Sequence, residues 1–219
     1  MVRSQFDAEL NSMHIDLDRM CHFVVQAIEN CVMAFKNHDY ELAKEIISND
    51  KAINNIERSI ESKCLSLILK QQPVASDLRD VSTALKVVTD LERIGDQSAD
   101  IAELILEIDE KDSYLMVGHI PAMATIAIKM VTNALNAFHE RDLSKAEAVK
   151  ETDKEMDRLF DEVKEELIKI VKEDKENIDL SIHFLMIAKY FERIGDHVVN
   201  ICEWVEFSQT GKLNNQRLI

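Results

Sequence analysis

The sequence is poor in the residues that form tight turns, with four glycines and two prolines among 219 residues. A many-stranded β fold needs such residues at short intervals between its strands, so the composition argues against that class. Disorder is excluded by a different observation, because 46% of the residues are hydrophobic and such a chain can bury a core. At about 100–200 residues per domain, the length allows one or two domains. We therefore expect a folded, all-α protein.

Positive charge is also scarce. The chain has 26 Lys and Arg residues against 41 Asp and Glu residues, which gives a net charge of -15 at pH 7. Because nucleic acids and many membrane surfaces are anionic, this balance argues against sequence-independent binding of either. We expect no nucleic-acid partner, and the balance favours cations and basic protein surfaces instead.

Long apolar runs are missing as well. The first nine residues contain no apolar stretch typical of a secretory signal. The longest uncharged segment, Ser113–Ile128, contains Gly118 and Pro121 and has 16 residues, whereas a membrane-spanning helix needs about 18. The four cysteines form no C-x-x-C pair, which suits a reducing compartment where disulfides are rare. We expect a cytoplasmic protein without membrane insertion.

Hydrophobic residues recur at helical spacing between a few breaks. Ile53, Ile56 and Ile60, for example, follow the i, i+3, i+7 pattern of one helix face. Pro73, the segment 118–121 and Gly211 mark the breaks. The pattern predicts six long helices, at about residues 4–37, 39–70, 74–109, 119–140, 142–173 and 177–208.

The chain contains an internal repeat. Residues 91–105 read LERIGDQSADIAELI and residues 191–205 read FERIGDHVVNICEWV, with seven of the fifteen positions identical. Further matches upstream occur at an offset of 103 instead of 100 residues, which a difference in loop length explains. We predict two tandem three-helix bundles that arose by duplication, residues 1–110 and 111–210, and a polar tail, residues 211–219.

Carboxylates gather on one face of four of the predicted helices. Glu92 and Asp96 lie one turn apart and therefore share a face, as do Glu192 and Asp196 in the second copy. The helix before each motif carries a similar stripe. The candidate metal ligands are Asp50, Glu57, Glu92, Asp96 and Asp100 in the first copy and Asp153, Asp157, Glu192, Asp196 and Glu203 in the second.

Counting residues from the turns places these stripes at the same level. From Pro73, Asn54 lies 19 residues back and Ile94 lies 21 residues ahead, or about 29 and 32 Å along an antiparallel helix pair. Carboxylates crowded together repel one another unless they are solvated, protonated or bridged by a cation. Hard cations such as Mg²⁺, Mn²⁺, Ca²⁺ and iron take oxygen ligands. The sequence therefore predicts one metal site in each copy.

Structural explanations of the same features stay open. Acidic stripes are commonly solvated helix faces, and Arg93 and Arg193 can pair with acids one turn away. Gly95 and Gly195, inside the repeated motif, indicate a close approach to the backbone, which a neighbouring helix can provide as well as a ligand. A metal-free helical scaffold is therefore one alternative.

A metal-dependent oxidase is the enzymatic alternative. The ferritin-like di-iron class also holds carboxylates in a helical bundle, but it needs two E-x-x-H motifs, and none of the seven histidines follows a glutamate at that spacing. His197, next to Asp196, is the one histidine near an acidic stripe and is a weaker candidate ligand. The sequence also lacks a Gly-rich phosphate loop and a nucleophile elbow. We expect a protein that is not an enzyme.

The duplicated ERIGD motif, with Gln72-Pro73 and Leu78-Arg79 ahead of its first copy, resembles the PhoU family of phosphate-signalling regulators over nearly the whole chain. The resemblance implies two three-helix bundles whose E/D-x-x-x-D motifs bind multinuclear iron or zinc clusters. Asn54 departs from the motif, because it stands where the first copy would carry its second acid. The residues that match the motif are Glu92, Asp96, Asp153, Asp157, Glu192 and Asp196.

The resemblance also implies partners. Members of this family are cytoplasmic, often dimeric adaptors that contact the phosphate-specific ABC transporter and a membrane-bound sensor histidine kinase. They hold the phosphate-starvation response off while phosphate is plentiful. We therefore expect a homodimeric, metal-binding negative regulator of phosphate uptake, with iron or zinc as its metal and manganese or magnesium as alternatives.

Overall fold

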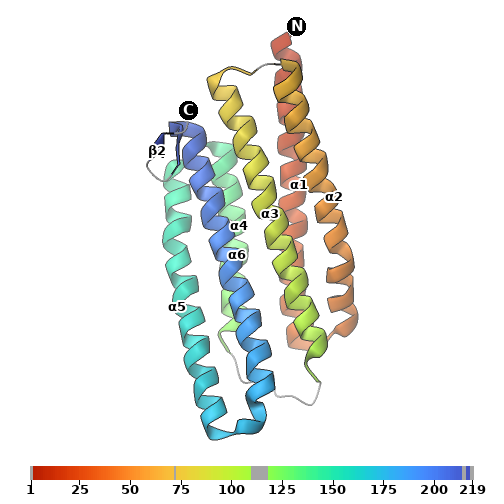
Figure 1. Cartoon of the computed structure of the whole chain (residues 1–219), viewed down its shortest axis with the longest axis vertical. Helices are drawn as coiled ribbons and strands as arrows, with labels where there is room; N and C mark the ends of the chain where they lie inside the picture. The colour runs from red at the N-terminus through yellow and green to blue at the C-terminus, as the bar shows by residue number, and fades with distance from the viewer. Residues whose placement is uncertain (1, 72, 110–117, 214–215, 218–219) are drawn as a thin grey trace.

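Within the described residues, the computed structural model contains six α-helices and a short β-hairpin (Figure 1). The structure describes residues 2–71, 73–109, 118–213 and 216–217. The elements are α1 (Val2–Asn37), α2 (Tyr40–Gln71), α3 (Ala75–Glu107), α4 (Ile120–Glu140), α5 (Leu143–Glu173), the 3-10 turn η2 (Lys175–Asn177), α6 (Ile178–Thr210), β1 (Lys212–Leu213) and β2 (Gln216–Arg217). The boundary predicted between residues 110 and 111 lies outside the described residues.

The helix ends agree with the prediction to within two residues, and local chemistry explains them. The Asp142 side chain accepts hydrogen bonds from the backbone at the start of α5, and Pro121 occupies the first turn of α4. Gly211 ends α6 with a positive φ of 70°, a conformation that glycine adopts without strain. The all-α class is confirmed, with the two-residue strands β1 and β2 as a small addition in the tail.

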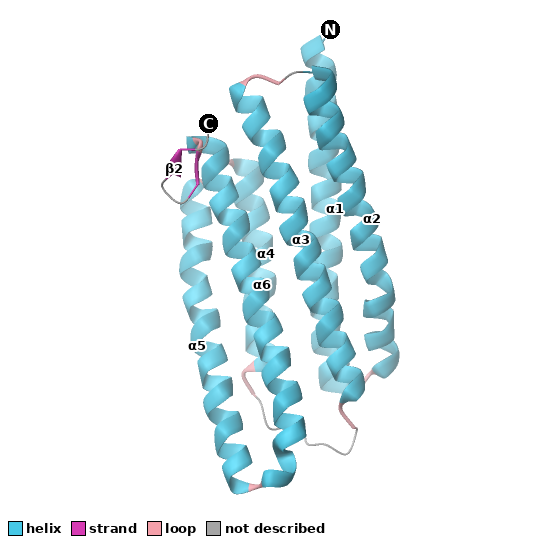
Figure 2. Cartoon of the chain, viewed as in Figure 1, coloured by secondary structure: helices cyan, strands magenta, loops and turns pink. Residues whose placement is uncertain are grey.

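The helices form two layers. Helices α2, α3, α6 and α5 stand side by side in that order, and α1 and α4 pack behind them (Figures 1 and 2). Helices α1, α2 and α3 make one three-helix bundle, and α4, α5 and α6 make the other. The bundles meet through contacts of α3 with α6 and of α1 with α4. The two predicted tandem bundles are confirmed.

One hydrophobic core continues through both bundles. Phe35 of α1 meets Phe184 of α6 edge to face, with 5.7 Å between the ring centroids. On α3, Ile94 and Ile101 are buried, which leaves the acidic residues of this helix on another face. The four cysteines are buried and free. In the described part of the chain, no helix is long and apolar enough to cross a membrane.

Candidate metal centre

The structure brings the acidic stripes of α2 and α3 together in the first repeat. At Gly95 of α3, an added Cβ would lie 3.0 Å from the Ile53 Cδ1 atom of α2 and 3.7 Å from the Asp50 Oδ1 atom. Burial raises the pKa of Asp50, and the negative charges of Asp96 and Asp100 on α3 raise it further. The two stripes are therefore neighbours, as the residue count from Pro73 predicts.

Two more glutamates belong to this first acidic patch. The pKa of Glu57 is raised by burial and by the charge of Glu61, with a further contribution from Asp96. The pKa of Glu92 is raised by burial and by the charges of Asp96 and Glu57. Because the same few carboxylates act on one another from both helices, they form one cluster. We call Asp50, Glu57, Glu92, Asp96 and Asp100 the first patch.

Asn54 has a definite place in the first patch. Its side-chain nitrogen donates a hydrogen bond to Asp50 Oδ2 at 2.9 Å. The other two oxygens, Asp50 Oδ1 and Asn54 Oδ1, are buried and have no hydrogen-bond donor among the described residues. A buried acceptor of this kind costs free energy unless a hydrogen-bond donor or a cation contacts it. Their chemistry fits a hard cation, which takes carboxylate and amide oxygens as ligands.

The second patch is made by Asp153 and Asp157 of α5 with Glu192 and Asp196 of α6. Burial and the charges of Asp157, Asp196 and Glu192 raise the pKa of Asp153 to about 6. The pKa of Asp196 is likewise raised, by burial and by the charge of Glu192. Asp153 also lies against the backbone of α6, because an added Cβ at Gly195 would lie 2.6 Å from its Oδ1 atom. Four carboxylates from two helices thus lie close enough to repel one another, and a cation among them would relieve that repulsion.

Asp100 and Glu203 lie at the margins of the two patches. Asp100 is hydrogen-bonded to Tyr190 of α6 and is near Arg193, while burial and the charges of Glu103 and Asp96 raise its pKa. It therefore joins the first patch to the second repeat. Glu203 lies two turns beyond Asp196 and is half-buried. The charges that raise the pKa of Asp153 are those of Asp157, Asp196 and Glu192, so Glu203 is not placed in the second patch.

Several of the acids already have cationic partners, one of which sequence reasoning missed. Arg93 lies 3.5 Å from Glu92 and 3.3 Å from Asp96, as the salt-bridge alternative predicts. Lys189 pairs with Glu192, and its ammonium group lies 5.4 Å from the centre of the Phe160 ring. As these side chains stand, no three His, Cys, Asp or Glu residues in the described ranges are arranged to hold a metal ion. Metal binding therefore requires some of these side chains to rotate.

His197 is engaged elsewhere. Its Nδ1 atom lies 2.9 Å from the Asp90 carboxylate of α3, so the ring joins the two repeats. The neighbouring Asn200 side chain donates a weaker hydrogen bond to the same carboxylate, at 3.4 Å. No sequence pattern links Asp90 with His197, because they lie in different repeats. This contact accounts for the histidine without a metal.

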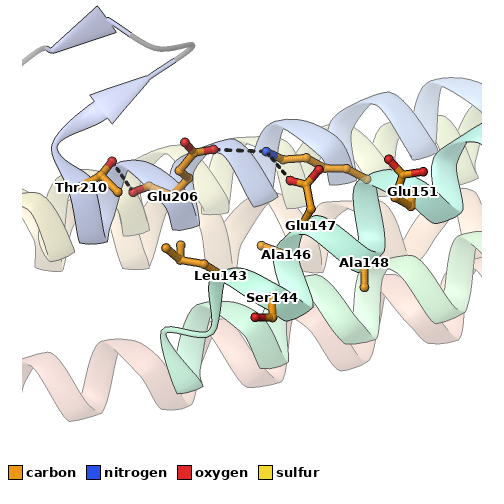
Figure 3. Close-up of a pocket in the computed structure, with 9 residues that line it drawn as sticks. Leu143, Ser144, Ala146, Glu147, Ala148, Glu151, Glu206 and Thr210 are labelled. Carbon is orange, nitrogen blue, oxygen red and sulfur yellow. Dashed lines mark hydrogen bonds and ion pairs between the residues drawn. The ribbon is translucent and has the colours of Figure 1, made fainter.

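A separate surface cavity of about 610 Å³ lies between the start of α5 and the end of α6 (Figure 3). Leu143, Ala146 and Glu206 are among the residues that line it. The Lys150 ammonium group lies 3.2 Å from Glu206 and 3.5 Å from Glu147. Because its charged groups pair with one another, this cavity offers a weaker candidate site than the two patches do.

The fold and the two patches define a class of protein: an all-α chain of two tandem three-helix repeats, each with carboxylates shared between its second and third helices. A profile of the PhoU domain matches residues 17–105 and 120–205, one match in each repeat. The chain belongs to the PhoU family.

Relatives and solved structures agree with this membership. A PhoU homolog named as a phosphate-specific transport system accessory protein, from Clostridium acetobutylicum, is 38% identical over 213 residues, which cover 97% of each chain. The accessory protein PhoU of Escherichia coli is 32% identical over 211 residues, with 96% of this chain and 88% of that one covered. The crystal structure of the phosphate transport system regulatory protein PhoU from Streptococcus pneumoniae is 30% identical and matches with a TM-score of 0.89, covering 95% of this chain and 98% of that one. PhoU from Pseudomonas aeruginosa is 34% identical and matches at 0.85, covering 94% and 100%.

Proposed function

We propose that this chain is a cytoplasmic, metal-binding regulator of phosphate uptake that restrains the phosphate-specific ABC transporter and the phosphate-starvation response. The observation that carries the proposal is the match, over nearly the whole chain, to accessory proteins of the phosphate-specific transport system. The chain acts by docking and is not an enzyme. Its partners are the transporter and a sensor histidine kinase, and its working form is a homodimer.

The metal belongs on the two patches. Asp153, Asp157, Glu192 and Asp196 would hold it in the second repeat, and Asp50, Glu92 and Asp96 in the first. When bound, iron, zinc, manganese or magnesium would supply positive charge that draws these carboxylates together. The role of the chain's own residues is to present oxygen atoms at one level of two packed helices. Asp50 Oδ1 and Asn54 Oδ1, which lack donors among the described residues, support this assignment.

Element analysis tests the metal part of the proposal. The protein as isolated is expected to carry metal, and Asp153→Asn with Asp157→Asn should reduce its content. Glu151→Gln is the matched control, because Glu151 is an exposed acid of α5 that pairs with Lys154 outside the patch. Metal content equal in all three proteins would contradict the assignment.

A pull-down from membranes that contain the transporter and the kinase tests the docking part. Because the chain carries a charge of -15, its association with basic surfaces should weaken as salt rises. We expect retention of one or both partners at low salt and less at moderate salt. Retention of neither at either salt concentration would remove the support for an adaptor. Incubation with ferrous iron and oxygen tests the alternative that the chain is a metal-dependent oxidase, since an oxidase would show turnover.

A further inference from the structure

An apolar groove runs between α5 and α6 at the end of the hairpin that they form, which is the lowest part of the molecule in Figure 1. Its volume is about 460 Å³. Ile168 and Ile182 line it from the two helices and are each 53% exposed, and Ile178 is 41% exposed. Single exposed apolar residues are normal, but a contiguous group of them marks a binding surface. We call this surface the tip groove.

The tip groove shares a face with the second patch. Val171 follows Asp153 by 18 residues, and Ile178 precedes Asp196 by 18 residues, which is five complete turns of helix. Both sides of the groove are therefore in line with the carboxylates, at most about 27 Å further along the hairpin. One exposed face of α5 and α6 carries the acids at its middle and the apolar groove at its end.

The charge of the groove is opposite to that of the chain. Its lining contains Lys164 and Lys172 and no acidic residue, although the net charge of the chain is -15. Lys164 lies 2.6 Å from Asp161, a surface ion pair of the kind that contributes little to stability, and 5.0 Å from the centre of the Phe160 ring. A ligand surface with carboxylates beside its apolar side chains would be complementary to the groove. A second copy of this chain, paired groove to groove, would bring two more lysines against these two.

The shape of the groove favours a helix. Two packed antiparallel helices leave a straight furrow between their side-chain rows, and a third helix fits such a furrow. Helices recognised in this way place apolar side chains at positions i, i+3, i+4 and i+7. We propose that the tip groove binds an amphipathic helix of a partner protein, with the apolar face of that helix in the groove and its flanking carboxylates paired with Lys164 and Lys172. This inference does not depend on the metal.

The first repeat offers a matched control surface. Leu65 of α2 is the equivalent of Ile168 at the offset of 103 residues, and it is also 53% exposed. However, Glu61 stands at the position of Lys164, and Leu69, which is 79% exposed, stands at the position of Lys172. The end of the α2–α3 hairpin is therefore apolar without the basic pair. A substitution there changes exposed apolar surface but leaves the tip groove intact.

Two synthetic peptides test the proposal on the full chain. Both are helical, about five turns long, with leucines at i, i+3, i+4 and i+7. One carries glutamates and the other lysines beside the leucines. Fluorescence anisotropy should show the acidic peptide binding about tenfold tighter than the basic one. The net charge of the chain, which is -15, would by itself favour the basic peptide. Ile182→Glu should weaken binding of the acidic peptide about tenfold or more, whereas Leu69→Glu should leave it unchanged.

A charge reversal completes the test. The double variant Lys164→Glu, Lys172→Glu should prefer the basic peptide, because its apolar groove is kept and only the rim changes. Circular dichroism checks that each variant is folded, and Ile182→Ser replaces Ile182→Glu if the charge disturbs folding. Preference of the unmodified chain for the basic peptide would overturn the proposal, as would equal losses in Ile182→Glu and Leu69→Glu. Sedimentation that shows a dimer dissociated by Ile182→Glu would assign the groove to a second copy and also overturn it.

Discussion

At the scale of single residues, Gly195 positions a carboxylate by lacking a side chain. Any Cβ at this position would lie 2.6 Å from Asp153 Oδ1, which is well inside van der Waals contact. At the equivalent Gly95, the close neighbour is the side chain of Ile53 instead. The same glycine in the two repeats therefore makes room for a carboxylate in one and for a core side chain in the other.

We predict that Gly195→Ala weakens metal binding at the second patch about tenfold, because Asp153 must move away from α6. The stability of the metal-free protein should change by less than about 1 kcal/mol, since alanine favours the helix by roughly that amount and the end of the Asp153 side chain can rotate. Calorimetric titration of Mn²⁺ and urea denaturation measure the two quantities. Gly95→Ala is the control, and it should leave binding at the second patch unchanged.

His14 lies in the contact between α1 and α4. Its ring centroid is 5.4 Å from that of Phe138 and 5.3 Å from that of His139. Burial, the charge of His139 and the charge of Arg141 lower the pKa of His14 to about 4, against the opposing effect of Asp18. As the pH falls below 6.5, His14 is therefore protonated in the unfolded chain, where its pKa is ordinary, before it is protonated in the folded chain.

We predict that His14 makes the protein less stable as the pH falls from 6.5 towards 4. Its contribution is fully present above pH 6.5 and is lost on the way down, because the unfolded state takes up the proton that the folded state excludes. The full shift of the pKa would correspond to about 3 kcal/mol, and solvent screening of the partly exposed ring reduces this to about 1–2 kcal/mol.

Urea denaturation at pH 7 and pH 4.5 measures this contribution. The difference between the two free energies of unfolding should be smaller in His14→Gln than in the unmodified protein by the predicted amount. His22→Gln, a substitution of an exposed histidine of the same helix, is the control. Identical pH dependence in His14→Gln and the unmodified protein would contradict the prediction.

At the scale of the helices, the sequence predicts most of what the structure contains. Helix ends are local, so Asp142 and Gly211 identify them without tertiary information. The meeting of the acidic stripes follows from turn positions and the rise of a helix. The ion pair of Lys189 with Glu192 also follows from a local pattern, because residues three apart share a helix face. The contact of His197 with Asp90 depends on how the repeats pack, which no local pattern encodes.

The two patches should bind metal unequally, with the second tighter. In the second patch, α5 carries Asp153 and Asp157 one turn apart, and α6 carries Glu192 and Asp196 one turn apart. These two pairs can bind a cation from both sides. In the first patch, Asn54 supplies a neutral amide that is already bonded to Asp50. Titration of Mn²⁺ or Zn²⁺ into metal-free protein should therefore show two classes of site.

Substitutions assign the two classes. Asp157→Asn should weaken the tighter class about tenfold, and Asn54→Asp should strengthen the weaker one several-fold, because each changes one anionic ligand. Glu151→Gln serves again as the exposed control on α5. If Asp157→Asn leaves the tight class unchanged while Glu92→Gln abolishes it, the two patches are assigned the wrong way round.

At the scale of the whole molecule, the two repeats share one hydrophobic core. Their buried side chains form a single core, and Phe35 of the first repeat packs on Phe184 of the second. The patch carboxylates are partly buried and lie between the second and third helices of each repeat. Burial of apolar surface, and not metal, is therefore the main source of stability, in contrast to small domains that unfold without their metal.

We predict that removal of metal leaves the helices formed. A chelator should change the far-UV circular dichroism at 25 °C by less than about a tenth, because the core that holds the helices contains none of the patch carboxylates. The melting temperature should still fall, since a ligand that binds only the folded state contributes about 3–4 kcal/mol at 100–1,000 times its dissociation constant. The variant with Asp153→Asn and Asp157→Asn should show a smaller fall on chelation, because it has lost the tighter site. Loss of most of the helical signal on chelation would show instead that the metal ions are part of the folding unit.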